Sequence, residues 1–75
     1  MDSLMPIIII WSEIERLMEL RGIPNRDALA YAAGIHRTNL YKIAKGDIQP
    51  SLLNLGKLCK ALRCQPGDLL RFDDD

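Results

Sequence analysis

The chain is poor in the side chains on which most enzymes and metal sites depend. Its 75 residues include one histidine and two cysteines. The five-residue spacing of Cys59 and Cys64 matches neither a CxxC redox pair nor half of a usual zinc site, so a zinc site would have to recruit carboxylates beside His36. No serine lies near that histidine in a strained turn, and no carboxylate pair flanks an evident pocket. The sequence therefore predicts no enzyme activity, no metal site and no cofactor.

Long hydrophobic runs are also absent. The four isoleucines at 7–10 follow Pro6, form too short a run for a signal peptide, and lead to no small-residue cleavage site. A membrane span needs about 20 apolar residues, and no such stretch exists here. We therefore expect a cytoplasmic protein with reduced cysteines and no membrane partner. No repeat or linker divides the chain, so residues 1–75 are expected to form a single small domain with its core at about 12–72.

An excess of charge of one sign is missing, because ten basic residues balance ten acidic ones. The charges are nevertheless segregated along the chain. Residues 1–20 and 64–75 each carry a formal charge of −3, whereas residues 21–63 hold eight basic and two acidic side chains and carry +6. Charge asymmetry of this kind, more than the total, steers a polyanion onto one face of a protein. The neutral total therefore does not exclude nucleic acid as a partner.

Scarce aromatic residues and four prolines indicate short helices joined by turns. Asn25 and Ser51 are good N-cap residues, and a glycine follows three of the helical runs. We expect five helices, at about residues 12–21, 26–33, 36 or 37–44, 52–63 and 66–70. The predicted buried stripe of the fourth comprises Leu52, Leu55, Leu58, Cys59 and Leu62. Residues 7–10 and 70–72 could form short strands, so the fold class is all-α with the option of short terminal strands.

The stretch from Leu29 to Ile43 indicates two helices joined at Gly34. Its apolar residues cannot all lie on one stripe of a continuous helix, because the period starts again after this glycine. A glycine readily takes the left-handed conformation that ends a helix, and Ile35 can then pack back on the last turn. The small Ala30 lets a second helix cross at short range, as in a helix-turn-helix unit. The outward face of the second helix comprises Arg37, Thr38, Tyr41, Lys42 and Lys45. This face can donate to phosphates and base edges, or it is the solvated basic face of an ordinary helical hairpin.

With these elements in place, the chain resembles the Cro/lambda-repressor-like helix-turn-helix family, also called XRE-like, over about residues 14–72. The matching segments are Leu29-Ala30 with Ala33-Gly34-Ile35, then Leu40 and Ile43, Lys45-Gly46, Pro50-Ser51-Leu52 and residues 55–62. The ending at 64–70 is similar to the small stand-alone regulators of that family. Two positions depart from the pattern. Arg26 stands where the family often has a glutamine that contacts phosphate or braces a recognition residue, and His36 stands where serine or threonine usually caps the third helix.

The resemblance implies a helix-turn-helix at about residues 26–45, with the helix near Arg37–Ala44 inserted into the major groove of double-stranded DNA. Arg37 is expected to bond to guanine O6 and N7 or to settle on a phosphate. Thr38 either contacts a base or caps its own helix. The complete set of expected DNA-binding residues is Arg26, His36, Arg37, Thr38, Asn39, Tyr41, Lys42 and Lys45.

The remaining members of this set have alternative roles. Tyr41 donates its hydroxyl to a phosphate or is a half-buried surface aromatic. Asn39 contacts DNA or binds the loop before the fourth helix, and Lys42 touches a base or the backbone. Arg26, at a helix N-terminus, is expected to clamp a phosphate, and Lys45 to grip the same DNA strand. We expect a solvated face of the fourth helix to carry Lys57, Lys60 and Arg63.

The implied function is that of a sequence-specific transcriptional regulator, most simply a repressor that excludes polymerase from a promoter. One such domain covers only a few base pairs, so we expect a homodimer on half-sites about 34 Å apart. The isoleucine run at 7–10 pairs either with the segment around Phe72 of its own chain or with the same run of a second copy. The alternative function is a protein-interaction module or antitoxin built on the same fold, with which the acidic tail Asp73-Asp74-Asp75 is compatible.

Overall fold

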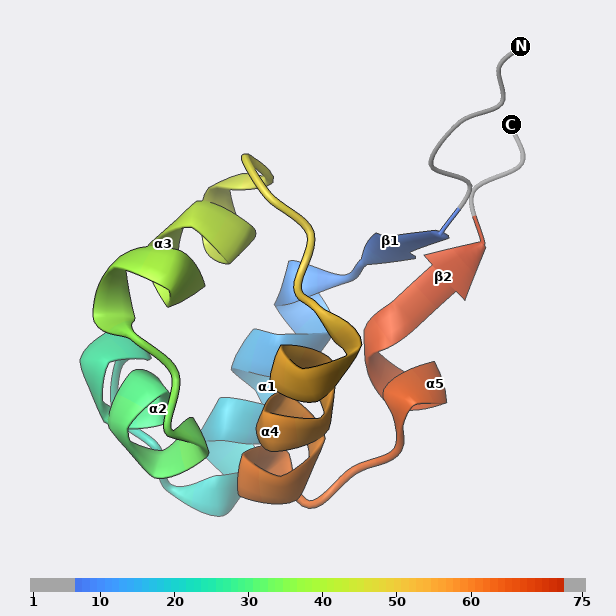
Figure 1. The fold of residues 1–75 in the computed structure, drawn as a ribbon. Helices are drawn as coiled ribbons and strands as arrows, with labels where there is room; N and C mark the ends of the chain where they lie inside the picture. The colour runs from blue at the N-terminus through green and yellow to red at the C-terminus, as the bar shows by residue number, and fades with distance from the viewer. Residues whose placement is uncertain (1–6, 73–75) are drawn as a thin grey trace, which may run out of the picture.

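A computed structural model describes residues 7–72, and the acidic tail Asp73-Asp74-Asp75 lies outside the described residues. Five helices and a two-stranded sheet make up this part of the chain. They are β1 (Ile7–Ile9), α1 (Trp11–Arg21), α2 (Arg26–Ala33), α3 (Arg37–Lys45), α4 (Leu52–Leu62), α5 (Pro66–Leu69) and β2 (Leu70–Phe72). Figure 1 shows α4 in front of α1, with α2 and α3 on one side and the two strands on the other. The predicted mostly helical fold with short terminal strands is confirmed.

The isoleucine run forms a strand that pairs within its own chain. β1 and β2 are antiparallel, with Ile7 opposite Phe72 and Ile9 opposite Leu70. The ladder is extended by a hydrogen bond of 2.8 Å from the Ile10 N–H to the Leu69 carbonyl. β-branched side chains favour this conformation. Of the two predicted pairings of this run, the structure has the one inside a single chain.

Local capping sets most of the helix boundaries. The Asn25 side chain accepts a 2.8 Å hydrogen bond from the Ala28 N–H, and the Ser51 hydroxyl accepts one of 3.0 Å from the Asn54 N–H. Both predicted N-caps are therefore confirmed. α1 begins one residue earlier than predicted and α3 ends one residue later. α4 ends at Leu62, because Arg63 takes a left-handed conformation with φ 54° and caps the helix.

The core lies where α1, α2 and α4 meet, with α5 against α1 and α4. Its completely buried side chains are Ile14, Leu29, Leu40, Leu58, Leu62 and Leu69. One predicted member of the α4 stripe is wrong: Leu52 is 87% exposed. Helical side chains lean toward the N-terminus, so a residue in the first turn leans past the end of its helix, away from the packed turns. The other four predicted stripe residues are buried.

Arg21 joins the end of α1 to the end of α4. Its Nε donates to the Leu62 carbonyl at 2.7 Å, and its Nη2 donates to the Arg63 carbonyl at 3.1 Å. These carbonyls belong to the last turn and cap of α4, where a helix leaves acceptors without partners inside the helix. The Arg21 side chain thus has a structural role, because it links the ends of α1 and α4.

Candidate nucleic-acid interface

The turn between α2 and α3 is built around Gly34, as predicted. This glycine has φ 72° and ψ 33°, and its N–H donates to the Tyr31 carbonyl at 3.2 Å. The next N–H, that of Ile35, reaches back to the Ala30 carbonyl at 3.0 Å, while the Ile35 side chain is buried. A residue with a side chain would be strained at this positive φ. The turn therefore fixes the direction in which α3 leaves α2.

His36 caps α3 in place of the serine or threonine expected from the family pattern. Its Nδ1 accepts a hydrogen bond of 3.2 Å from the Thr38 N–H, so α3 begins at Arg37. An imidazole nitrogen can accept in this way only while it is unprotonated. His36 is therefore engaged in a contact that shapes the start of the helix.

One face of α3 points inward and the other toward solvent. Leu40 and Ile43 are buried, which leaves the outward residues on a common exposed side. An open depression of about 490 Å³ is lined by the same five residues that periodicity placed there, namely Arg37, Thr38, Tyr41, Lys42 and Lys45. Asn39 is exposed but does not line it. The structure thus brings five of the eight predicted site residues to one concave surface.

An acidic residue that the sequence did not single out lies beside this surface. Asp27, in the first turn of α2, accepts a 2.9 Å hydrogen bond through Oδ1 from the Tyr41 hydroxyl. Its Oδ2 lies 3.6 Å from Nη1 of Arg37. The bond to this carboxylate stabilises the protonated phenol and raises the pKa of Tyr41 above its ordinary value. The Tyr41 hydroxyl, predicted to reach a phosphate, is thus already a donor to Asp27.

Arg26 lies close to two aromatic rings. Its guanidinium carbon is 5.2 Å from the centre of the Trp11 ring and 5.7 Å from that of Tyr41. Its Nη2 is also 4.0 Å from a Glu15 carboxylate oxygen. A guanidinium has five N–H donors, so these cation–π contacts leave N–H groups for other acceptors. The predicted phosphate clamp is therefore compatible with this position.

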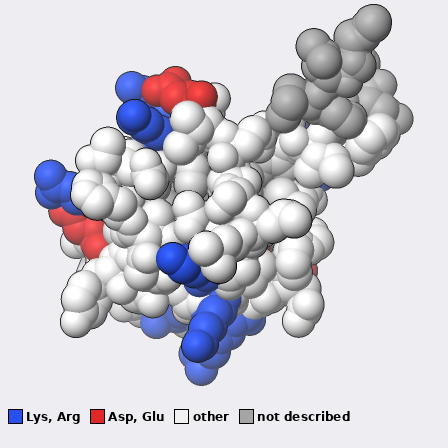
Figure 2. All heavy atoms as spheres, in the orientation of Figure 1, with Lys and Arg blue, Asp and Glu red and all other residues white. Residues whose placement is uncertain are grey.

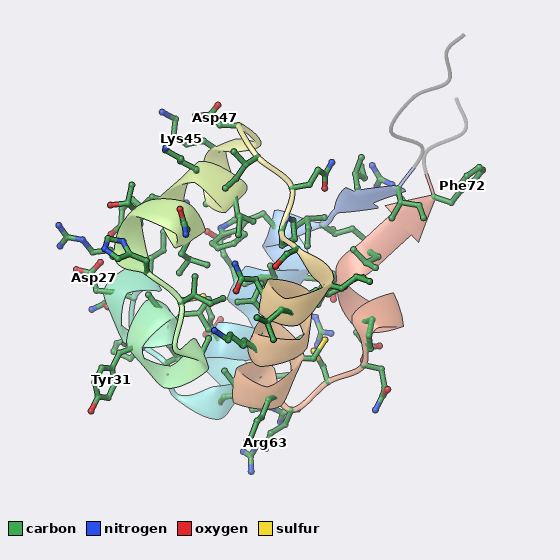
Figure 3. All side chains as sticks on the ribbon, in the orientation of Figure 1. Asp27, Tyr31, Lys45, Asp47, Arg63 and Phe72 are labelled. Carbon is green, nitrogen blue, oxygen red and sulfur yellow. The ribbon has the colours of Figure 1, made fainter. Side chains whose placement is uncertain are left out.

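Basic and acidic side chains alternate along the α3 side of the molecule (Figure 2). Lys45 Nζ lies 3.4 Å from Asp47 Oδ2, and both side chains project from the end of α3 and its following turn (Figure 3).

The sequence predicts that Lys57 lies on a solvated face of α4, whereas in the structure its side chain contacts another element. Its Nζ donates to the Gly34 carbonyl at 3.3 Å, so it contacts the turn itself. Neither Asp27 nor this contact of Lys57 carried a signal in the sequence, because the partners lie 14 and 23 residues away.

The two cysteines behave as packing residues. Cys59 is buried and Cys64 is half-buried, and both are free thiols. Burial, together with the neighbouring Cys59, raises the pKa of the Cys64 thiol to about 11. A protonated thiol is a poor nucleophile and a poor metal ligand. Among residues 7–72 there is no group of three or more histidine, cysteine or acidic side chains placed to hold a metal ion, and no helix there is long and apolar enough to cross a membrane.

The chain is similar to known DNA-binding and regulatory proteins. Residues 13–75 match the Cro/C1-type HTH DNA-binding domain. The control protein C.BamHI of Bacillus amyloliquefaciens is 42% identical over 48 residues, which cover 64% of this chain and 59% of that protein. The crystal structure of the restriction-modification controller protein C.AhdI from Aeromonas hydrophila is similar with a TM-score of 0.65 and 26% identity, over 76% of this chain and 85% of that one.

Proposed function

Because the chain belongs to the Cro/C1-type helix-turn-helix DNA-binding family, we propose that it regulates transcription by inserting α3 into the major groove of a specific DNA site. The observation that carries this proposal is the exposed face of α3, which bears Thr38 and the three basic side chains of Arg37, Lys42 and Lys45. A helix fits the major groove, and these side chains supply donors for both base edges and phosphates. Arg37 and Thr38, at the start of α3, are assigned to bases.

The other site residues are assigned mainly to positioning. Lys42 lies one turn after Thr38 and reaches a base or the backbone. Arg26, the first residue of α2, is assigned to a phosphate, which it would reach with N–H groups that its contacts with the two rings leave free. Lys45 contacts the backbone beyond the end of α3. Asn39 stays a candidate on the exposed side of α3, and His36 acts through the helix start that it caps.

The genes under control are proposed to be those of a restriction-modification system. This rests on the two relatives, one named a control protein and the other a restriction-modification controller protein. The simplest mode of action is in the cytoplasm, where the bound protein excludes polymerase from a promoter. Repression is therefore the expected outcome at a site that overlaps the promoter.

Selection of bound sequences from a random DNA pool tests this function. We expect the protein to shift labelled random DNA at low salt and to enrich a defined motif in successive rounds. Failure to shift any DNA at low salt would overturn the proposal. It would favour the alternative, a protein-interaction module on the same fold.

Lys45→Ala is expected to weaken binding to all DNA sequences by the same factor. A lysine on phosphate carries no sequence information, and loss of one phosphate contact reduces the slope of log K against log salt by about 0.9. Titrations on the selected motif and on random DNA at several salt concentrations measure this. Lys60→Ala is the matched control, because Lys60 is an exposed lysine in the last turn of α4. An equal change of slope in the control would contradict the placement of DNA on α3.

A homodimer is proposed as the binding unit, since two copies on a palindrome read enough bases for useful specificity. Exposed apolar side chains offer surfaces that a second copy would cover: Leu52 (87%) and Leu53 (69%) at the start of α4, and Ile7 (51%) and Phe72 (62%) on the strands. The adjacent pair on α4 is the larger exposed apolar feature. β1 also keeps one edge without a partner strand among the described residues.

Light scattering at about tens of micromolar protein is expected to give twice the chain mass of 8.5 kDa. Leu53→Ser should shift the protein toward monomer, because it removes apolar area from the proposed contact. Leu20→Ser, at a single exposed leucine on α1, should leave the mass unchanged. A monomeric wild-type protein would contradict the dimer. If Leu53→Ser remained a dimer, the interface would be assigned to the strands instead of α4.

A further inference from the structure

One carboxylate bridges two successive turns of α3. Residues 37 and 41 are four apart and therefore lie above one another on the same side of the helix. Asp27 contacts both, with Oδ1 2.9 Å from the Tyr41 hydroxyl oxygen and Oδ2 3.6 Å from Nη1 of Arg37. In Figure 3 the Asp27 side chain points from α2 toward α3. Asp27, in the first turn of α2, thus contacts Arg37, which is assigned to bases, and Tyr41, which lines the same surface.

The Tyr41 end of this contact is itself supported from α1. The Tyr41 ring lies beneath the guanidinium of Arg26, which also lies over Trp11 and near Glu15. An isolated surface ion pair contributes little, because two flexible side chains must be held in one geometry. Here the Tyr41 hydroxyl, on a side chain that also contacts Arg26, donates to one carboxylate oxygen of Asp27, and Arg37 pairs with the other oxygen.

The second observation is the negative charge of Asp27. Asp27 is 53% exposed and stands beside a basic surface that is proposed to meet a polyanion. A carboxylate there repels phosphate and lowers affinity for DNA of any sequence. A guanidinium has five N–H donors, so a contact through Nη1 leaves others free for a base edge. The arrangement weakens general binding while it restrains the one side chain best suited to read guanine.

We propose that Asp27 is a specificity-determining residue: it positions Arg37 for a base edge and keeps phosphate away from that guanidinium. This inference rests on the proposed function, because it assumes that α3 reads DNA. Asp27 acts through Arg37 and Tyr41 and needs no contact with DNA itself. Without its charge, Arg37 settles on the nearest phosphate, and one position of the DNA site is no longer read.

The test compares Asp27→Asn with Asp47→Asn. Each substitution removes one carboxylate that is 53% exposed and paired with a basic residue of α3, Arg37 in one case and Lys45 in the other. Both should bind random DNA more tightly, by a few-fold, because a repulsive charge is lost. Titrations use random DNA and the selected motif, together with variants of the motif changed at one base pair each.

We expect Asp27→Asn to lower the ratio of motif to random affinity by about five-fold or more, the range of one lost base contact. The loss should fall on the same base pair as in Arg37→Ala, whereas Asp47→Asn should leave the preference at every position unchanged. Tyr41→Phe leaves the Asp27 charge and the first turn of α2 intact, and should reduce the ratio less. It also provides the test if Asp27→Asn fails to fold, as thermal unfolding would reveal.

Equal effects of Asp27→Asn and Asp47→Asn at all base pairs would overturn the inference, and so would an unchanged ratio in Tyr41→Phe if that is the only folded variant. These results leave the proposed function standing, since wild-type protein would still bind its motif. Failure of the wild type to bind any DNA would instead overturn the proposed function. The two failures are therefore distinguishable in one set of titrations.

Discussion

Leu40→Ala is expected to lower the free energy of unfolding by about 2–5 kcal/mol, the usual cost of a leucine-sized cavity in a packed core. Leu40 is completely buried and belongs to the same cluster as Ile14 and Leu58. A core of this size contributes only about 3–5 kcal/mol of net stability. The variant should therefore retain little of its stability and unfold at a much lower urea concentration than the wild type. Urea titration followed by circular dichroism at 222 nm measures the loss.

Leu20→Ala is the matched control for this variant. Leu20 is 62% exposed on α1, and surface substitutions of this kind change stability by no more than about 0.5 kcal/mol. Its unfolding midpoint should stay close to that of the wild type. If both variants lost the same stability, the packing of α3 on the core through Leu40 would be refuted.

Arg37→Ala is expected to reduce discrimination between the selected motif and random DNA by about 1–3 kcal/mol, or roughly 5- to 150-fold. The physical reason is the loss of two donors that match guanine O6 and N7. Single-base variants of the motif should show that the preference disappears at one base pair and survives at the others. Affinity for random DNA should fall much less.

The comparison with Lys45→Ala separates base contacts from phosphate contacts at opposite ends of α3. If Arg37→Ala weakened the motif and random DNA by the same factor, Arg37 would belong to the phosphate contacts. α3 would then read bases through Thr38 or Lys42. Each outcome assigns a role to the start of the helix.

The sequence was sufficient to predict the parts of the fold that depend on near neighbours. Asn25 and Ser51 cap helices through N–H groups three residues away, and Gly34 ends α2 through its own backbone conformation. Such signals lie within one turn of chain and can be recognised from spacing alone. Periodicity also separated the two faces of α3, because Leu40 and Ile43 recur at helical spacing.

Other features depend on segments that meet only in the folded protein. Leu52 continues the apolar period of α4, yet it is exposed, because periodicity does not reveal whether a neighbouring element covers the first turn. The contacts of Asp27 could not be predicted either, since they require α2 and α3 to cross at one particular angle. Asp27, which contacts Arg37 and Tyr41 of α3, is the residue next to Arg26, where the family pattern often has a bracing glutamine.

The bond from Lys57 to the Gly34 carbonyl also bears on the dipole of α2. The last turns of α1, α3 and α4 each contain a basic residue, namely Arg21, then Lys42 and Lys45, then Lys60, whereas the last turn of α2 contains none. A helix carries partial negative charge at its C-terminus, which a nearby cation stabilises. Lys57 supplies that cation from α4. A residue of α4 thus provides at the C-terminus of α2 the positive charge that the sequence of α2 itself does not.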